Sequence, residues 1–226
     1  MNSNADSGII ELRRLLSDRF PLTRTWSKSA PAKIHSGSPT GLPHLDSLLE
    51  GGLGKSAITE VASHGSGAGA ALFLRALLRQ SGHAGQLMGL IDGCDSFDPD
   101  GLEASVLSRL FWVRCATADE ALKAADLILR DRNLSLVVLD LKMNPAAQLR
   151  KISGAAWYRL QRLARQSATA FVALTPHPMI ASAQTRLILE SRFTLDALPQ
   201  DQSQLLSELK FELVRSAISQ QKEAAS

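Results

Sequence analysis

Residues 58–78 read ITEVASHGSGAGAALFLRALL, and the order of their parts indicates the fold class of the chain. A short run of apolar and β-branched residues, Ile58–Ala62, predicts a strand. A turn rich in glycine follows, and the apolar segment Ala68–Gln80 predicts a helix. A strand that passes through a tight turn into a helix is the opening unit of a sheet whose strands are joined by crossover helices. The stretch therefore predicts an α/β protein.

The chain repeats this alternation as far as residue 174. Further apolar strands are expected at Gln86–Asp92, Leu110–Val113, Leu134–Asp140 and Ala168–Leu174, and further helices at Ala118–Arg130 and Ala146–Gln166. Continuous apolar strands between helices indicate a mostly parallel, twisted sheet with helices on both faces. After residue 174 the pattern changes, and it predicts an antiparallel edge with one solvated face at Leu187–Leu189, Phe193–Leu195 and the alternating Leu209, Phe211 and Leu213.

The length of 226 residues suits one large domain with short tails. Apolar residues at helical spacing in Ile9–Phe20 predict an N-terminal helix, and a flexible basic linker is expected up to residue 39. A core is expected over residues 40–215, opened by a short helix that carries Leu45. Residues 216–226 are expected to form a tail.

The composition places limits on the class of protein. A hydrophobic content of 45% with 21% charged residues is typical of a globular protein and argues against disorder. Cys94 and Cys115 fit neither a disulfide framework nor a zinc spacing, which indicates a reducing compartment. Because no apolar run is long enough for a membrane span and the start, MNSNADSG, does not resemble a secretory signal, we expect a cytoplasmic protein with no membrane partner. The net charge of +3 permits a nucleic-acid or acidic partner without requiring one.

The turn at residues 63–69 has the layout of a phosphate-binding loop, in which glycines let backbone N–H groups converge on phosphate oxygens at the start of a helix. That mechanism also uses a lysine for the β- and γ-phosphates and a Ser or Thr hydroxyl for magnesium. In one register Ala68 and Gly69 occupy those two places, and in the other Gly69 and Ala70 do. The sequence therefore supplies neither the cation nor the metal ligand.

We interpret this loop as a relic that only connects the strand to the helix. The alternative is residual binding of an anion through the backbone, at a vestigial nucleotide site formed by Gly65, Ser66, Gly67, Gly69 and Asp140. We accordingly expect no cofactor, with residual ATP binding as the alternative.

Several acidic residues follow the predicted strands. Asp140 has the form of the acid that holds the water shell of magnesium in nucleotide-binding enzymes, but a cap on the next turn is the interpretation we favour. Asp92, Asp95 and Asp98 are spaced three apart, and we favour a turn over a cation site for them because Asp98 precedes a proline. Cys94 has no neighbouring base, which argues against a nucleophile. We expect no metal site and no catalytic residue.

The segment Leu149–Gln166 is basic and contains no acidic residue. Its cations can contact DNA phosphates or an acidic partner, or they can simply cover a solvated helix face. Three of the arginines are three residues apart and are predicted to share one flank of a helix opposite its apolar stripe. For Trp157-Tyr158, beside this flank, we favour packing over the stacking of a base. The candidate DNA-binding or partner-binding residues are Arg150, Lys151, Arg159, Arg162 and Arg165.

Five segments between Thr40 and Arg215 together resemble the core of the RecA-like recombinases. They are TGLPHLDSLLEGGLGKSAITEV before the nucleotide loop, LIDGCDSFDP at the second strand, LVVLDL at the metal-binding acid, ARQSATAFVALTP before the second DNA-binding loop, and RFTLDAL with LKFELVRS at the closing strands. The resemblance implies a RecA-like core over residues 40–215.

The chain also departs from that family beyond the missing lysine and threonine. Cys94 stands where the family has its catalytic glutamate, and Thr175-Pro176 stands where it has a polar pair ending in the glutamine that senses nucleotide. Both DNA-binding loops are expected to be severely shortened, because one helix is predicted to fill most of the chain between Asp140 and Ala168. These departures argue against a recombinase that aligns single strands.

The subgroup that fits these losses is the ImuA type, RecA-like accessory proteins of a damage-inducible translesion mutasome, and RLFWVRCATADEALKAADLIL is similar to its strand–helix unit. The resemblance implies a non-catalytic adaptor in the SOS response. Its partners would be a translesion polymerase-like subunit or another DNA-repair protein, with single-stranded DNA as a further candidate. One alternative is a DNA-dependent ATPase whose lysine comes from elsewhere, for example Lys55 or a neighbouring subunit. Another is a cell-division inhibitor like SulA, to which the ImuA type is related.

Overall fold

The computed structural model describes residues 37–65, 68–194, 196 and 201–215. The helix predicted at Ile9–Phe20, most of the linker and the tail at residues 216–226 lie outside the described residues. Within the described part of the chain, no helix combines the length and the apolar character that crossing a bilayer requires.

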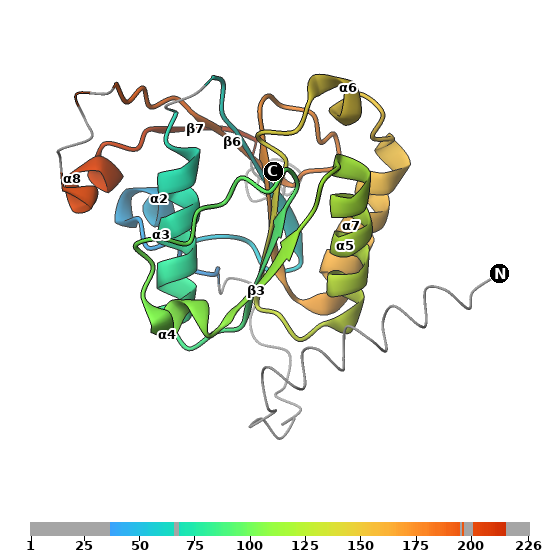
Figure 1. Ribbon diagram of the computed structural model, residues 1–226, viewed down its shortest axis with the longest axis horizontal. Coiled ribbons are helices and arrows are strands. Elements are labelled where there is room, and N and C mark those ends of the chain that lie inside the picture. Colours follow the sequence, from blue (N-terminus) through green and yellow to red (C-terminus); the bar gives the residue numbers. More distant parts are fainter. Residues whose placement is uncertain (1–36, 66–67, 195, 197–200, 216–226) are drawn as a thin grey trace, which may run out of the picture.

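One sheet of seven strands is formed by the described residues (Figure 1). The first six strands in sheet order are parallel, and the last is antiparallel to its neighbour. This arrangement confirms the predicted α/β class, with a mostly parallel sheet and an antiparallel C-terminal pair. In sheet order the strands are β3 (Leu110–Arg114), β2 (Met88–Asp92), β4 (Leu136–Asp140), β5 (Ala170–Thr175), β1 (Ala57–Ala62), β6 (Thr185–Leu189) and β7 (Phe211–Arg215).

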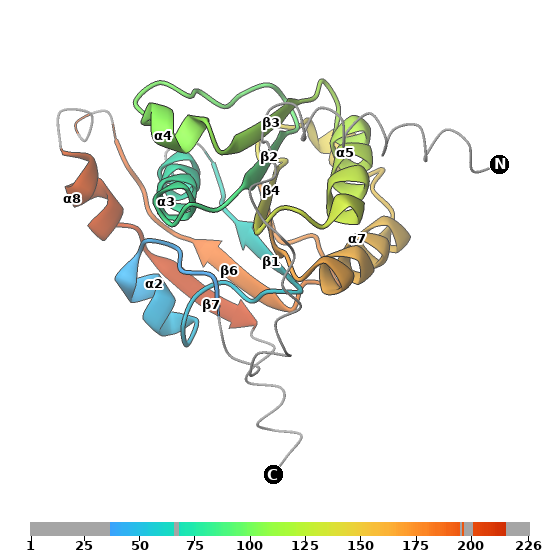
Figure 2. The same ribbon diagram turned by 90° about the horizontal axis from the view of Figure 1, so that it is seen from below.

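Helices cover both faces of the sheet, as the sequence predicts (Figure 2). Each helical layer encloses its own core, with Phe73 and Leu77 buried in one and Leu129 and Trp157 buried in the other. The first layer contains α2 (Pro43–Leu48), α3 (Ala70–His83), α4 (Ala104–Leu107) and α8 (Gln202–Ser207), and the second contains α5 (Ala118–Asp131), α6 (Ala146–Leu149) and α7 (Gly154–Ser167).

The central strands are apolar at successive positions because both of their faces are covered. In β4, Leu136 and Val138 belong to the core beneath α3, whereas Val137 and Leu139 belong to the core beneath α5 and α7. All four side chains are buried. The strand ends at Asp140, so its carboxyl end delivers an acidic side chain to the edge of the sheet at which binding sites of α/β proteins usually lie.

The prediction of one helix over Ala146–Gln166 is wrong, because α6 ends at Leu149 and α7 begins at Gly154. Ser153 caps the second helix: its backbone is extended, and its hydroxyl oxygen accepts a hydrogen bond from the N–H of Ala156 at 3.3 Å. A serine in this position starts a helix rather than continuing one. The break leaves Arg150 and Lys151 in the turn between the two helices.

The predicted strand at Phe193–Leu195 is also wrong for its described residues, 193 and 194. Strand β6 ends at Leu189, and after one more backbone hydrogen bond, from the N–H of Glu190 to the carbonyl of Lys210, the hydroxyl of Ser191 accepts a hydrogen bond from the N–H of Lys210 at 2.8 Å. A side chain thus replaces the backbone as the partner, and the ladder stops. Phe193 packs against the core beneath α3 instead.

Candidate functional site

The loop between β1 and α3 lies at the carboxyl end of the sheet, where its layout predicts it. Gly65 and Gly69 have φ angles of 70° and 84°, in the left-handed region that favours glycine. The helix begins at Ala70, two residues later than predicted, and no side chain caps it. Ser66 and Gly67, which belong to the proposed vestigial nucleotide site, lie outside the described residues.

The glycine at position 69 has a packing reason of its own. A Cβ placed there would lie 2.5 Å from Cδ2 of Leu209 and 3.0 Å from Cε2 of Phe193. Both residues belong to the C-terminal part of the chain, which closes over the start of α3. The positive φ angle and the approach of these apolar side chains therefore both favour glycine at position 69, whether or not a phosphate binds the loop.

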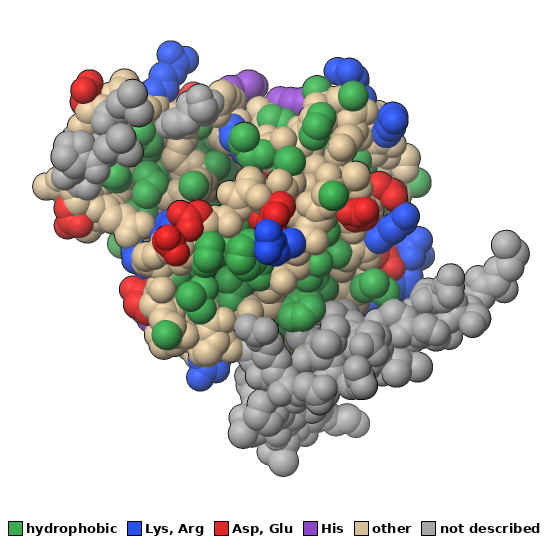
Figure 3. Space-filling view, viewed as in Figure 1, with side chains coloured by type: hydrophobic (Ala, Val, Ile, Leu, Met, Phe, Trp, Pro, Cys, Tyr) green, Lys and Arg blue, Asp and Glu red, His purple; other side chains and the backbone are tan. Residues whose placement is uncertain are grey.

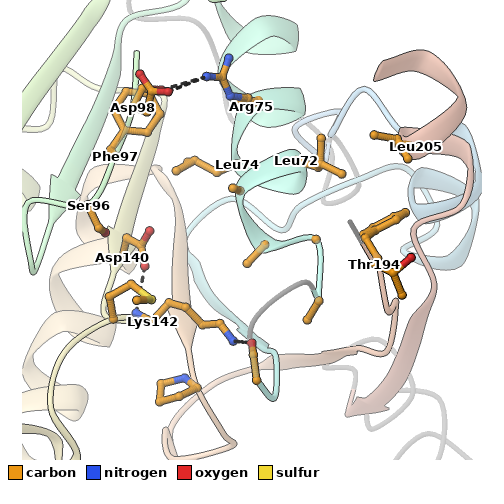
Figure 4. A pocket seen from close by; sticks show the side chains of 18 residues that line it. Leu72, Leu74, Arg75, Ser96, Phe97, Asp98, Asp140, Lys142, Thr194 and Leu205 are labelled. Atoms are coloured by element: carbon orange, nitrogen blue, oxygen red, sulfur yellow. Dashed lines mark hydrogen bonds and ion pairs between the residues drawn. The ribbon is translucent and has the colours of Figure 1, made fainter. Parts of the chain in front are cut away.

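A lysine does reach the loop, but it comes from another strand. The ammonium group of Lys142, two residues after β4, donates hydrogen bonds to the carbonyl oxygens of Ser63 and Gly65, the latter at 2.7 Å (Figure 4). Burial lowers the pKa of Lys142, and the nearby charge of Asp140 partly opposes that shift. Sequence reasoning missed this residue, since β5 lies between β4 and β1 in the sheet and only the strand order brings Lys142 to the loop.

Asp140 makes the contact expected of a residue that caps the next turn. Its Oδ1 accepts a hydrogen bond from the backbone N–H of Lys142 at 2.9 Å. Burial raises the pKa of Asp140 to about 6, and the negative charge of Asp92, its neighbour across β2 and β4, adds to this shift. The carboxyl group therefore lies next to the loop in an environment that disfavours its charge.

The three aspartates after β2 each have a structural partner. The buried carboxylate of Asp92 accepts hydrogen bonds from the N–H groups of Ser96 and Phe97 at 2.9 and 2.8 Å. The carboxylate of Asp95 accepts hydrogen bonds from Nε and Nη2 of Arg114, and this pairing lowers the pKa of Asp95. Asp98 accepts a hydrogen bond from the N–H of Asp100 at 2.9 Å, as the predicted turn requires.

The aspartates therefore shape the turn that follows β2. Within the described part of the chain, no cluster of three or more His, Cys, Asp or Glu side chains has the arrangement of a metal site.

A cavity of about 800 Å³ lies beside the loop, between α3, the turn after β2 and the segment that leads to α8 (Figure 4). Lys142 and Asp140 lie at one end of it, and an ion pair between Arg75 and Asp98 lies at the other. Most of the remaining lining is apolar: Ala68, Ala70, Ala71, Leu72, Leu74, Phe97, Met143, Pro176, Phe193 and Leu205. The place where a nucleotide would lie is thus a largely apolar hollow with few polar groups.

Lys55, considered as a donor of the missing cation, lies on the wrong side for that role. It precedes β1 by two residues, whereas the loop follows the last residue of the same strand. Lys55 therefore lies at the amino edge of the sheet, and it cannot reach the loop of its own chain.

The predicted basic flank is divided by the structure. Arg159 donates two hydrogen bonds to the carboxylate of Asp126 on α5, at 2.6 and 3.0 Å. Arg162 and Arg165 are exposed on α7, and Arg150 and Lys151 are exposed in the turn before it. The two neighbouring aromatic residues separate as well, because Trp157 is 3% exposed and Tyr158 is 60% exposed. The favoured packing role is confirmed for Trp157 and wrong for Tyr158.

A buried ion pair fastens the chain that follows β5. Glu60, in the middle of β1, is completely buried, and its Oε2 accepts a hydrogen bond from Nε of Arg186 on β6 at 2.7 Å. Its Oε1 accepts hydrogen bonds from the N–H groups of Met179 and Ile180 at 2.6 and 3.0 Å. Arg186 also donates to the carbonyl of Ile180. One carboxylate thus secures the segment where the resemblance implies a DNA-binding loop.

In comparisons with known proteins, neither a family model nor a curated protein matches the chain. The structure therefore defines the class of protein: an α/β fold with a mostly parallel sheet, in which a lysine after β4 reaches two carbonyl oxygens of the loop after β1.

Proposed function

We propose that this chain is a non-catalytic adaptor with a RecA-like core of the ImuA type, which joins a translesion polymerase-like subunit to DNA during the response to DNA damage. The observation that supports it most is the position of Lys142, whose ammonium group is held by carbonyl oxygens of the loop between β1 and α3. The cytoplasmic location and the partner are parts of the same proposal.

A loop that binds phosphate presents N–H groups to its ligand and keeps a lysine free to contact it. Here the lysine that reaches the loop is bound to two carbonyl oxygens, Ser63 O and Gly65 O. A triphosphate that recruits this lysine would have to displace both contacts, which are hydrogen bonds to a charged and partly buried ammonium group. The loop is thus stabilised without a ligand.

The magnesium site of a nucleotide-binding enzyme also has no counterpart. Ala68, Gly69 and Ala70 carry no hydroxyl group at the position of the metal ligand. Asp140, the acid that could hold a metal, instead accepts a hydrogen bond from the backbone N–H of Lys142 and caps the turn after β4. A fold that keeps its sheet while losing these groups suits a protein whose role is to bind other macromolecules.

The test is to mix the purified chain with ATP and magnesium, with and without single-stranded DNA. We expect no heat of ATP binding in titration calorimetry and no DNA-stimulated release of phosphate. Lys142→Met should lower the free energy of unfolding by about 1–3 kcal/mol, because the carbonyls of the buried Ser63 and the exposed Gly65 lose a charged donor, and should leave the ATP result unchanged. Turnover comparable to that of a recombinase would reject the adaptor.

One observation favours a second candidate, a DNA-dependent ATPase. Lys142 lies at the loop and Asp140 lies beside it, so a rotation of the lysine side chain would supply the missing cation from the neighbouring strand. This candidate predicts that the wild-type chain binds ATP and that Lys142→Met abolishes the binding. Measurable binding that survives the substitution would contradict this mechanism.

A further inference from the structure

The positive charge of this protein is concentrated in one part of the sequence. Between Asp140 and Glu190 there is no acidic residue, and this acid-free stretch carries seven of the 25 basic residues. The rest of the chain, with 18 basic and 22 acidic residues, has a net charge of −4. The acid-free stretch covers α6, α7, β5 and β6, and Figure 3 shows Lys and Arg side chains along the margin of the molecule that carries α6 and the pair α5 and α7.

Three of the seven basic residues are engaged by the protein itself. Lys142 is bound to the loop carbonyls, Arg159 to Asp126 and Arg186 to Glu60. The other four are exposed, and none has an ion-pair partner among the described residues: Arg150, Lys151, Arg162 and Arg165. These four cations are available to a ligand.

Tyr158 lies among these free cations. It is the only tyrosine of the chain, and 60% of it is exposed although the adjacent Trp157 is buried. Arg162 and Arg165 follow it at four and seven residues, a spacing that places all three side chains on one face of a helix. No acidic residue interrupts α7. The outer face of α7 therefore presents an aromatic ring with two guanidinium groups along about 10 Å of helix.

We propose that this face of α7 binds single-stranded nucleic acid, with one base stacked on Tyr158 and the adjoining phosphates contacted by Arg162 and Arg165. An exposed aromatic ring flanked by arginines recognises unpaired bases, since every base has a stacking face and the phosphates supply the charge. Base pairs in a duplex are already stacked and do not offer that face. The choice of DNA as the nucleic acid rests on the proposed function, and the rest of the inference does not.

Fluorescence anisotropy of a labelled oligothymidylate with the full chain tests this inference. Tyr158→Ala should weaken binding by ~5- to 150-fold, the loss of one stacked base worth ~1–3 kcal/mol, whereas Tyr158→Phe should stay within about twofold of the wild type. The double variant Arg162→Gln/Arg165→Gln should reduce the slope of log affinity against log salt by ~1.4, or ~0.7 for each phosphate contact. Tyr158→Ala should leave that slope unchanged.

Arg159→Gln is the matched control, because it removes a charge from the same helix that is already bound to Asp126. It should change the affinity by less than about twofold. Thermal melting of each variant checks that the domain remains folded. A duplex of the same length should bind more weakly than the single strand.

Three results would overturn the inference. One is a wild-type chain that does not bind the oligonucleotide at low salt. Another is a Tyr158→Ala variant that binds as well as Tyr158→Phe. The third is capture of an acidic protein that depends on Arg162 and Arg165 while the oligonucleotide is ignored, which would make this face a protein-docking surface. The ATP assays test the non-catalytic adaptor independently, so failure here, which would remove DNA from its ligands, is distinguishable from failure of the proposed function.

Discussion

Two groups of cations from the same acid-free stretch meet opposite surroundings. Lys142, just after β4, and Arg186, near the start of β6, bind backbone carbonyls and the buried carboxylate of Glu60. Arg162 and Arg165 lie on the outer face of α7, where the described residues offer no ion-pair partner. The sequence shows which stretch of the chain is basic. Only the fold shows which of its cations are bound by the protein itself and which remain available to a ligand.

The largest effect on stability is expected at Arg186, which belongs to the group of cations bound by the protein itself and pairs with a completely buried carboxylate. Arg186→Met leaves Glu60, which is 0% exposed, without a counter-charge. Loss of one member of a buried ion pair typically costs about 3–5 kcal/mol. Urea denaturation should show this loss, while Arg165→Met on the outer face should change the free energy of unfolding by less than about 0.5 kcal/mol. If the two variants lost the same free energy of unfolding, the distinction between cations bound by the protein and cations on the outer face of α7 would be wrong.

A smaller effect of opposite sign is expected at Asp140, beside Lys142. Because its pKa is raised to about 6 from 3.8, the folded protein holds a proton there that the unfolded chain releases at lower pH. The free energy of unfolding therefore falls as the pH rises from about 4 to about 6 and stays lower above that range. Asp140→Asn should remove this loss and stabilise the protein at pH 7 by on the order of 2–3 kcal/mol.

Denaturation of the Asp140→Asn variant at two pH values checks the sign. The gain should nearly vanish at about pH 4, where the carboxyl group of the wild type is protonated in the folded state. Asp98→Asn, at a side chain that is 72% exposed, is the control and should show no comparable gain. A variant that is less stable than the wild type at pH 7 would mean that Lys142 compensates the charge of Asp140 fully.

The smallest effect on stability is expected at Arg159, which is bound by the protein like the first group but exposed like the second. Its side chain is 54% exposed, and Asp126 keeps a second partner in Arg130. Pairs at such positions are worth about 0.2–1 kcal/mol, so Arg159→Gln should destabilise the protein by no more than that. Arg162→Gln should have no measurable effect on the same denaturation curve. A larger loss for Arg162 would show that it has a structural partner after all.

Most of the fold follows from local patterns in the sequence. The apolar runs that end at Asp92 and Asp140 predict central parallel strands, because a strand covered on both faces needs apolar side chains at every position. The turn between β1 and α3 can also be predicted from neighbouring residues, because glycines follow an apolar strand and precede an apolar helix. The break between α6 and α7 depends on one serine, Ser153, and the apolar spacing on either side of it conceals the cap.

The site is less accessible to sequence reasoning. Lys142 meets the loop only because β5 is inserted between β4 and β1, and Glu60 meets Arg186 across 126 residues of chain. Spacing along the sequence carries no information about either contact. The exposure of Tyr158 depends on which of two adjacent aromatic residues the helix turns toward the core, and the start of α7 at Gly154 sets that rotation.

The carboxylate of Glu60 has a mechanical consequence. It joins three separate pieces of backbone, β1, residues 179–180 and β6, so none of them can shift without stranding a charge in the interior. A partner that bound the segment between β5 and β6 would therefore meet a backbone that the buried carboxylate fixes at residues 179 and 180.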